Sequence, residues 1–299
     1  MTFKKSRETT GETIFDVVNI LIMILLLLSV AYPIWYILVY SFDDAIDASK
    51  AAFMLFPRKF TLYNYNIVFK DKAIFHAFAI TVLRTVVGTV SSVFFTAMVS
   101  YGLSKKYLIG RKIYMGIGIV TLVFSAGMIP SYFVIKSLHL LNSFWVYIIP
   151  GLFSFYNALI FISFFKGLPD SIEESAQIDG ANEFTIFLRI IIPLSMPVIA
   201  TIALFNGVGQ YNDYFTYVLY ITDNESLRTM QNYLYQIIQA NTALAMMKNV
   251  PAEMMAQNKT SAESLKYASM VVTCVPIVIV YPFLQKYFIK GVLIGSVKG

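Results

Sequence analysis

Three polar side chains interrupt an apolar segment in the last third of the chain. Asn206, Gln210 and Asp213 are separated by four and three residues, so a helix would project all three from one face. Tyr211 and Asn212 lie between the last two of them. Amide donors and acceptors, a carboxylate and an aromatic ring suit a sugar, whose hydroxyls bond at the edge and whose C–H face stacks on a ring. This polar face is therefore a candidate pathway for a carbohydrate solute.

The same residues also have a purely structural explanation. Inside a membrane, Asn and Gln side chains join helices through hydrogen bonds, and glycines such as Gly207 and Gly209 permit close packing. Asp213 could lie near the outer interface, where a charge costs little. Arg84 could be a pathway charge, but it falls in the first third of its apolar segment, which favours a side chain that extends to the outer interface.

A second polar cluster forms a loop between two apolar segments. Ser171 and Glu174 fit the S-x-x-E capping box, so a short helix should run from there to about Ile178. Gly180 supplies the left-handed residue that ends this helix. A second short helix is expected at about 183–191. The polar run itself reads Glu174-Ser175-Ala176-Gln177-Ile178-Asp179-Gly180-Ala181.

This loop has no evident use unless another protein binds it. Ala176 places a small side chain between charges that we expect to be exposed, which would let a second protein approach closely. Pro193 marks the entry into the next apolar segment. The alternative is a capped connector in which Glu174 serves only its own helix.

Composition places the chain in a membrane. Of its 299 residues 58% are apolar and only 13% charged, unlike a soluble domain. The chain has one cysteine, Cys274, which excludes a disulfide framework and a cysteine-based metal cluster. Its two histidines, His76 and His139, lie far apart in the sequence, which argues against a histidine-rich metal site. The net charge is +6, but the basic residues lie in short loops, so membrane topology explains them better than nucleic-acid binding. The sequence holds no G-x-x-x-x-G-K-[ST], so energy must come from another subunit or an ion gradient.

Six apolar segments are long enough to cross a bilayer as helices, which predicts an all-α membrane protein. We expect Pro130 to kink the third. The first follows three basic residues but is too long for a signal sequence and lacks a small-residue cleavage site, so we expect it to be retained. The segments are roughly 14–41, 78–103, 114–136, 143–165, 194–221 and 267–289.

Basic residues in the short loops predict the orientation. If six helices alternate, three basic groups share one side, which is cytoplasmic by the positive-inside rule. These groups are Lys4, Lys5 and Arg7; Lys105, Lys106, Arg111 and Lys112; and Lys286, Lys290 and Lys298. Residues 226–248 have helical periodicity and should lie against the outer surface. The predicted layout is a cytoplasmic N-terminus (1–13), a first helix (14–41), an external loop (42–73), a core (74–290) with a cytoplasmic loop (170–192) and an external loop (222–266), and a cytoplasmic tail (291–299).

The residue order of the polar loop resembles a known motif. E-S-A-x-x-D-G-A with Pro193 downstream is similar to the EAA loop of ABC importer permeases, E-A-A-x-x-x-G followed by I-x-L-P. Ser175 replaces the first alanine, and Ile192 stands directly before the proline. Other stretches resemble the carbohydrate-uptake permeases, in particular the smaller maltose permease subunit: Phe60-Thr61-Leu62-Tyr63-Asn64-Tyr65, Ser100-Tyr101-Gly102-Leu103-Ser104-Lys105, and the ending from Lys286 to Gly299. In the family the 211–213 stretch often reads W-N-D, so Tyr211 departs from it.

The resemblance implies a type I ABC importer permease fold and a mechanism. The loop would dock on an ATPase subunit. Glu174 would pair with a basic residue of that subunit, and Gly180 would keep the bend of the loop. The other residues of the motif are Ser175, Ala176, Asp179, Ala181 and Pro193. ATP and Mg²⁺ would be used by the ATPase, and this chain would bind no cofactor and catalyse no reaction. The family's tail reaches toward the ATPase dimer, which implies contacts for Gly295, Lys298 and Gly299.

The resemblance also implies partners: a second permease, two ATPase subunits and an external solute-binding protein, in a bacterial cell membrane. The expected solute is an oligosaccharide or related carbohydrate. An ABC permease for a polyamine, phosphate or amino acid is the first alternative, and the tail and the F-T-L-x-N-Y stretch argue against it. A secondary transporter should show repeated halves and an ion-coupling charge, and neither is evident. An integral-membrane enzyme is the least expected, because no paired carboxylates or histidine cluster occur at one membrane face.

Overall fold

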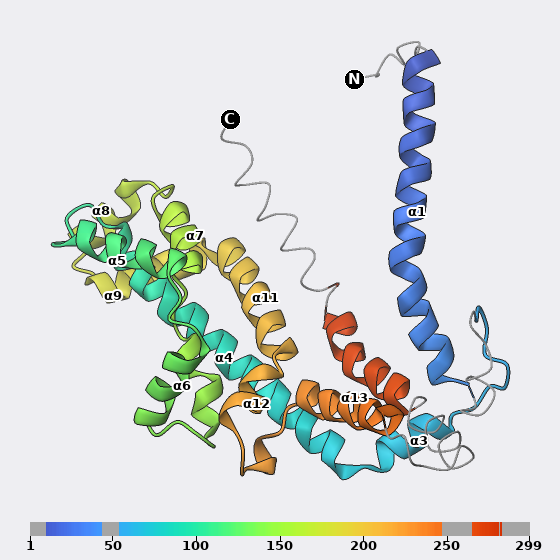
Figure 1. The fold of residues 1–299 in the computed structure, drawn as a ribbon. Helices are drawn as coiled ribbons and strands as arrows, with labels where there is room; N and C mark the ends of the chain where they lie inside the picture. Colours follow the sequence, from blue (N-terminus) through green and yellow to red (C-terminus); the bar gives the residue numbers. More distant parts are fainter. Residues whose placement is uncertain (1–9, 44–53, 247–264, 281, 283–299) are drawn as a thin grey trace. The chain divides into compact units, whose positions relative to one another are not determined.

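A computed structural model of the protein describes residues 10–43, 54–246, 265–280 and 282 (Figure 1). Over these ranges the regular elements are helices, and the only strand-like pairing is an isolated antiparallel bridge between Asp43 and Phe60. The all-α prediction is therefore confirmed for the described part of the chain. The chain divides into two compact units, one of Met1–Lys70 with Ile237–Val272 and one of Asp71–Gln236 with Thr273–Gly299.

The first unit contains a long apolar helix, α1 (Thr10–Ser41). Its side chains from Ile14 to Val30 are exposed within the chain, although almost all of them are apolar. A helix of 32 residues is longer than the roughly 20 needed to cross a bilayer, and lipid would cover such side chains. α1 fits the first predicted membrane segment.

The chain after α1 folds back onto the end of that helix. Asn64, in α3 (Tyr63–Lys70), is buried and donates hydrogen bonds to the carbonyl oxygens of Ser41 and Asp43, at 3.1 and 3.0 Å. The Tyr65 hydroxyl lies 2.7 Å from the Ser41 hydroxyl. The Asn and the second Tyr of the F-T-L-x-N-Y stretch therefore fasten this loop to the helix before it.

The second unit is built around α4 (Lys72–Ser104), which is about 50 Å long at 1.5 Å per residue. This helix starts six residues before the predicted position 78, because the carboxylate of Asp71 caps it by accepting a hydrogen bond from the Ala73 amide at 2.9 Å. Two further helices, α7 (Phe155–Phe165) and α11 (Met196–Asn212), pack along α4 (Figure 1).

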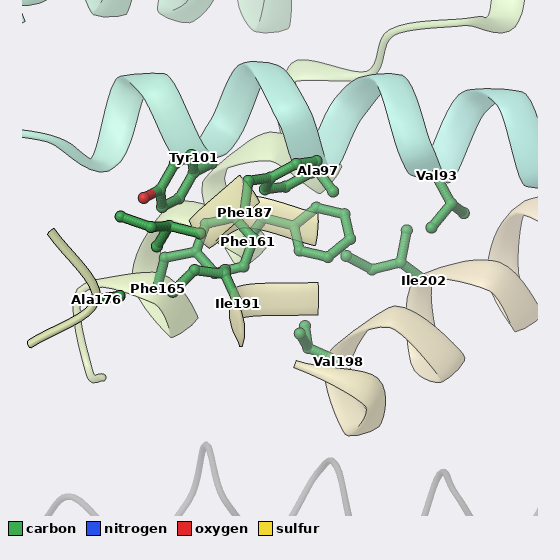
Figure 2. Packing of buried hydrophobic residues seen from close by; sticks show 11 residues of the cluster. Val93, Ala97, Tyr101, Phe161, Phe165, Ala176, Phe187, Ile191, Val198 and Ile202 are labelled. Atoms are coloured by element: carbon green, nitrogen blue, oxygen red, sulfur yellow. The ribbon is translucent and has the colours of Figure 1, made fainter. Parts of the chain in front are cut away.

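One end of this helix packing is filled by apolar side chains from all three helices and from the loop between α7 and α11. Figure 2 shows them converging beneath α4, with the Tyr101 ring 5.4 Å from that of Phe187. Interdigitated rings and branched side chains give close contacts that hold the helices in one register. The cluster comprises Val93, Ala97, Tyr101, Phe161, Phe165, Ala176, Ile186, Phe187, Ile191, Val198 and Ile202.

The third predicted segment is broken, but not where we expected. It forms α5 (Arg111–Val123) and α6 (Met128–Ser137), and the break lies at residues 124–127, before Pro130. Gly127 precedes α6 with φ +81°, a conformation that favours glycine. Pro130 lies in the first turn of α6, where its missing N–H is not needed by the helix, so the predicted kink at Pro130 is wrong.

Two more predicted segments are interrupted. The fourth starts as two 3-10 turns, Phe144–Tyr147 and Ile149–Gly151, and bends by 49° before α7. The fifth breaks at Asp213 between α11 and α12 (Phe215–Tyr220). For the sixth, the described helix is Leu265–Val280. In the described residues α1 and α4 qualify as spans by length and composition, and up to four spans qualify if each bent pair counts as one, so six spans remains a prediction.

Another helix occupies most of the predicted 226–248 segment. α13 (Met230–Met246) follows a short 3-10 turn, Glu225–Leu227. Its first amide, that of Met230, donates a 2.7 Å hydrogen bond to the buried hydroxyl of Thr81 in α4. The predicted helix is confirmed, and its start is fixed on α4.

Candidate functional site

The polar loop between α7 and α11 begins with the predicted short helix, but without the predicted cap. α8 spans Asp170–Ile178, and its N-cap is Pro169, whose carbonyl accepts from the Ile172 amide at 3.2 Å. Ser171 therefore lies inside the first turn and cannot serve as the N-cap, so the predicted capping box with Glu174 is wrong. An acidic first turn still favours the helix, because carboxylates stabilise the positive end of the helix dipole.

The end of α8 confirms the prediction for Gly180. This residue has φ +81°, and its amide bonds the Gln177 carbonyl at 3.0 Å while the Ala181 amide bonds the Ala176 carbonyl at 2.9 Å. These two bonds form a Schellman motif, which ends a helix with a defined geometry. Asn182 then caps α9 (Glu183–Ile186) by accepting from the Thr185 amide at 2.8 Å. The two short helices are thus joined by a fixed turn.

The second half of the loop differs from the prediction at Pro193. After α9 the chain continues as a π-helical turn, Phe187–Ile191, and as α10 (Ile192–Leu194), which contains the proline. The bend of 82° into α11 comes after Leu194, so Pro193 does not mark the entry into α11. A wide π turn directly precedes the position where the chain lacks an N–H, which is a common site for such irregularities.

The side chains of α8 fall on two faces. Ala176 is only 7% exposed and packs in the cluster of Figure 2, so the expectation that it lies between exposed charges is wrong. Ile178, at 86% exposure, is the aliphatic side chain that α8 offers to a partner. Glu174, Ser175 and Asp179 are also exposed and Ala181 is partly buried. We call Glu174, Ser175, Ile178 and Asp179 the docking face.

The opposite side of the loop is held to the end of α4 by ionic and hydrogen-bonding groups. The carboxylate of Glu183 accepts from the hydroxyls of Tyr101 and Tyr107, at 3.0 and 2.8 Å, and from the Gln177 amide group at 3.1 Å. Lys105 forms an ion pair with Glu173 and lies 4.0 Å from Glu183. We call Tyr101, Lys105, Tyr107, Glu173, Gln177 and Glu183 the α4-end clamp.

The clamp changes the acidity of its members. Burial would raise the pKa of Glu183, but the hydrogen bonds from the two tyrosines and Gln177 and the charge of Lys105 outweigh it, so the pKa lies below its ordinary value. Burial and the bond to the Glu183 carboxylate raise the pKa of Tyr107 to about 12. Burial lowers the pKa of Lys105, and the charges of Glu183 and Asp170 offset part of this effect. From the sequence, Lys105 was only a marker of topology.

A second polar site lies where α11 breaks. Arg84 of α4 is 2% exposed, donates a 2.7 Å ion-pair bond to the Asp213 carboxylate and bonds the Asp213 carbonyl at 3.1 Å. Its Nε and Nη2 also donate to the Gln210 side-chain oxygen, at 3.2 and 3.0 Å. The guanidinium lies 4.2 Å from the centre of the Tyr147 ring. The expectation that Arg84 extends to the outer interface is wrong, because partners 126 to 129 residues away hold it inside.

The predicted polar face of α11 exists, and it is turned toward α4. Asn206 donates to the Ser92 hydroxyl at 2.9 Å, and Gln210 and Asp213 bind Arg84. Gly88 makes room for this packing, since a Cβ there would lie 2.9 Å from the Gln210 side chain. These are hydrogen bonds between helices, as expected from the purely structural explanation of this polar face.

The two residues between Gln210 and Asp213 point elsewhere. Tyr211 is buried and its hydroxyl donates to the Thr273 carbonyl at 2.8 Å. Asn212 is exposed, and its side-chain oxygen accepts from Gln231 at 3.2 Å. Asp213 also accepts from the Phe215 and Thr216 amides at 2.9 and 3.1 Å, so it starts α12 as well as neutralising Arg84. The tail residues Gly295, Lys298 and Gly299 lie outside the described residues.

Comparison with known proteins gives this arrangement a context. Residues 6–294 match the family described as "Binding-protein-dependent transport system inner membrane component". The chain is 39% identical to "Protein LplC" of Bacillus subtilis (strain 168), over 98% of this chain and 97% of that protein. It is 38% identical to the "Polygalacturonan/rhamnogalacturonan transport system permease protein YtcP" of the same organism, over 96% and 99%.

A solved structure is similar as well. It is described as a "crystal structure of a bacterial ABC transporter involved in the import of the acidic polysaccharide alginate". One of its chains superposes with a TM-score of 0.85 and 30% identity, covering 95% of this chain and all of that one. The family match spans nearly the whole sequence and the described helices follow the fold of an ABC importer permease, so the resemblance read from the EAA-like loop is confirmed. This chain belongs to the family of binding-protein-dependent transport system inner membrane components.

Proposed function

We propose that this chain is one of two membrane permease subunits of an ATP-driven ABC importer for an oligosaccharide. The observation that carries the proposal is the loop at 170–192, whose fixed turn at Gly180 presents the docking face with Ile178 exposed among polar side chains, in a sequence that holds no G-x-x-x-x-G-K-[ST] motif. An exposed aliphatic side chain ringed by polar groups is a common anchor at protein interfaces.

In the proposed complex, two ATPase subunits bind ATP and Mg²⁺ on the cytoplasmic side and close around the docking loops of the two permeases. Closure turns the helix bundles outward, and hydrolysis resets them. Six membrane helices with both termini in the cytoplasm would place 170–192 on that side and leave 42–73 and 222–266 outside for a solute-binding protein. The tail at Gly295, Lys298 and Gly299 would approach the ATPases.

The proposed solute pathway passes the break of α11. Asn212 is an exposed polar residue there, while Asn206, Gln210, Tyr211 and Asp213 hold the helices around it. The carbohydrate assignment is supported by two similar proteins, one named for polygalacturonan and rhamnogalacturonan transport and one described as importing the acidic polysaccharide alginate. Acidic oligosaccharides are therefore the first test solutes, and neutral ones serve for comparison.

The experiment is uptake into proteoliposomes that contain this chain, its partner permease, the two ATPases and the solute-binding protein. We expect ATP-dependent accumulation of a labelled oligosaccharide, with oligogalacturonides and neutral maltooligosaccharides compared as competitors. Accumulation competed by amino acids or polyamines but not by sugars would contradict the carbohydrate assignment. Ion-driven uptake by this chain alone would contradict the ABC assignment and favour a secondary transporter.

A further inference from the structure

We propose that the α4-end clamp, centred on Lys105, transmits movement of the α8–α9 loop to α4, so that Lys105 is a positioning residue for coupled transport. This inference rests on the proposed function, since it assumes that an ATPase moves the loop. It concerns the opposite side of the loop from the docking face: the residues that connect the loop to the rest of this chain.

The clamp ties both short helices to one end of one long helix. Lys105 directly follows α4, and its side chain is 11% exposed. It pairs with Glu173 of α8 and lies 4.0 Å from Glu183 of α9. Its ammonium group also sits 4.0 Å from the centre of the Tyr101 ring, in cation–π geometry. One cation thus contacts α8, α9 and α4 together.

Hydrogen bonds to Glu183 reinforce this connection. Tyr101 comes from α4, Tyr107 from the α4–α5 connection and Gln177 from α8, and all three donate to the one carboxylate. Glu183 is 51% exposed, so water screens each bond and no single one is strong. Directional bonds from three elements nevertheless add to the apolar contacts around Phe187 in restricting sliding and rotation.

The clamp joins the α8–α9 loop to α4, and each of these two parts can move as a rigid unit. The α8–α9 turn is fixed by its Schellman motif and by the Asn182 cap. α4 is one uninterrupted helix from the clamp to Arg84, a separation of about 25 Å at 1.5 Å per residue from Tyr101. Arg84 in turn binds the α11 break at Asp213. A contiguous set of contacts therefore links the docking loop to the proposed solute pathway.

The test uses the complete complex in proteoliposomes and compares Lys105→Met with Lys105→Arg. Methionine keeps the length and packing of the stem but removes the charge, whereas arginine retains the charge. We expect Lys105→Met to co-purify with the ATPases and to hydrolyse ATP, with uptake per ATP reduced about tenfold, a typical size for coupling between sites. Lys105→Arg should restore most of the ratio. Lys106→Met is the matched control, because Lys106 is 88% exposed, and its ratio should be unchanged.

Three outcomes would overturn the inference. The first is an unchanged uptake-to-hydrolysis ratio in Lys105→Met. The second is loss of ATPase co-purification in this variant, which would assign Lys105 to the docking surface itself. The third applies if the Lys105→Met protein does not accumulate. Tyr107→Phe then removes the exposed hydroxyl that donates to Glu183, and a wild-type uptake-to-hydrolysis ratio in that variant would contradict the clamp. Failure of the proposed function is distinct, because the wild-type complex would then show no ATP-dependent uptake of any carbohydrate.

Discussion

Replacing Asp213 by asparagine should lower the free energy of unfolding in detergent by about 3 kcal/mol, the lower end of the range for removing one member of a buried ion pair. Asparagine keeps an oxygen that can cap α12 and removes only the charge. The guanidinium of Arg84 is 2% exposed and would lose its counter-ion. The measurement is the unfolding free energy of the purified protein by denaturant titration or steric trapping.

Replacing the partner, Arg84, shows which of the two charges is more costly to leave unpaired. Arg84→Met should cost less than Asp213→Asn, because the Asp213 carboxylate is 27% exposed and still accepts two backbone amides. The double variant should be more stable than the sum of the two losses predicts, since neither charge is left unpaired. Lys106→Met, at an ion pair whose partners are both more than four-fifths exposed, should change stability by less than about 0.5 kcal/mol. Strictly additive losses would contradict the assignment of this pair.

Replacing Gly180 by proline should abolish ATP-driven uptake while the chain still inserts in the membrane. Proline fixes φ near −65° and lacks an N–H, whereas Gly180 has φ +81° and donates to the Gln177 carbonyl. The turn between α8 and α9 would open, and the docking face would lose its geometry. Uptake in proteoliposomes and ATPase co-purification from detergent measure the two effects.

Graded substitutions separate backbone strain from side-chain contact at this position. An added Cβ meets no atom within 4 Å at Gly180, so an alanine is opposed by its left-handed φ alone, at about 1–2 kcal/mol. Asparagine tolerates this conformation better, and Gly180→Asn should retain most ATPase binding. Gly116→Ala, inside α5 with open space around it, is the matched control and should behave as wild type. Normal ATPase binding by Gly180→Pro would refute the role of this turn.

Local features of the candidate site were predictable because they depend on neighbours in sequence. The left-handed Gly180 and the end of α8 at Ile178 follow from capping chemistry within a few residues, whereas the predicted N-terminal cap at Ser171 was wrong. Burial of Ala176 and exposure of Ile178 did not follow, because the face of a nine-residue helix that meets the core is decided by distant residues such as Phe165 and Phe187. The motif therefore located the loop correctly but assigned the wrong face to Ala176.

The long-range contacts were not available from composition or periodicity. The sequence alone allows Arg84 either to snorkel or to pair, and only its contacts at the end of α11 decide between them. Lys105 likewise reads only as a topology marker until α8 and α9 are seen to pack against it. Hydropathy likewise finds apolar segments but not the breaks at residues 124–127 and at Asp213. At those breaks Gly127, with its positive φ, and the Asp213 carboxylate each begin the next helix, while the surrounding residues stay apolar.

Site-specific photo-crosslinking can identify which segment of this chain touches the ATPase. A photoreactive phenylalanine analogue replaces Ile178, the exposed aliphatic residue of the docking face, or Tyr63, an exposed residue in the predicted external segment. In membranes that contain the complete complex, we expect a crosslink from position 178 to the ATPase and none from position 63 to it. A crosslink to the ATPase from position 63, with none from position 178, would contradict both the orientation and the docking of this loop.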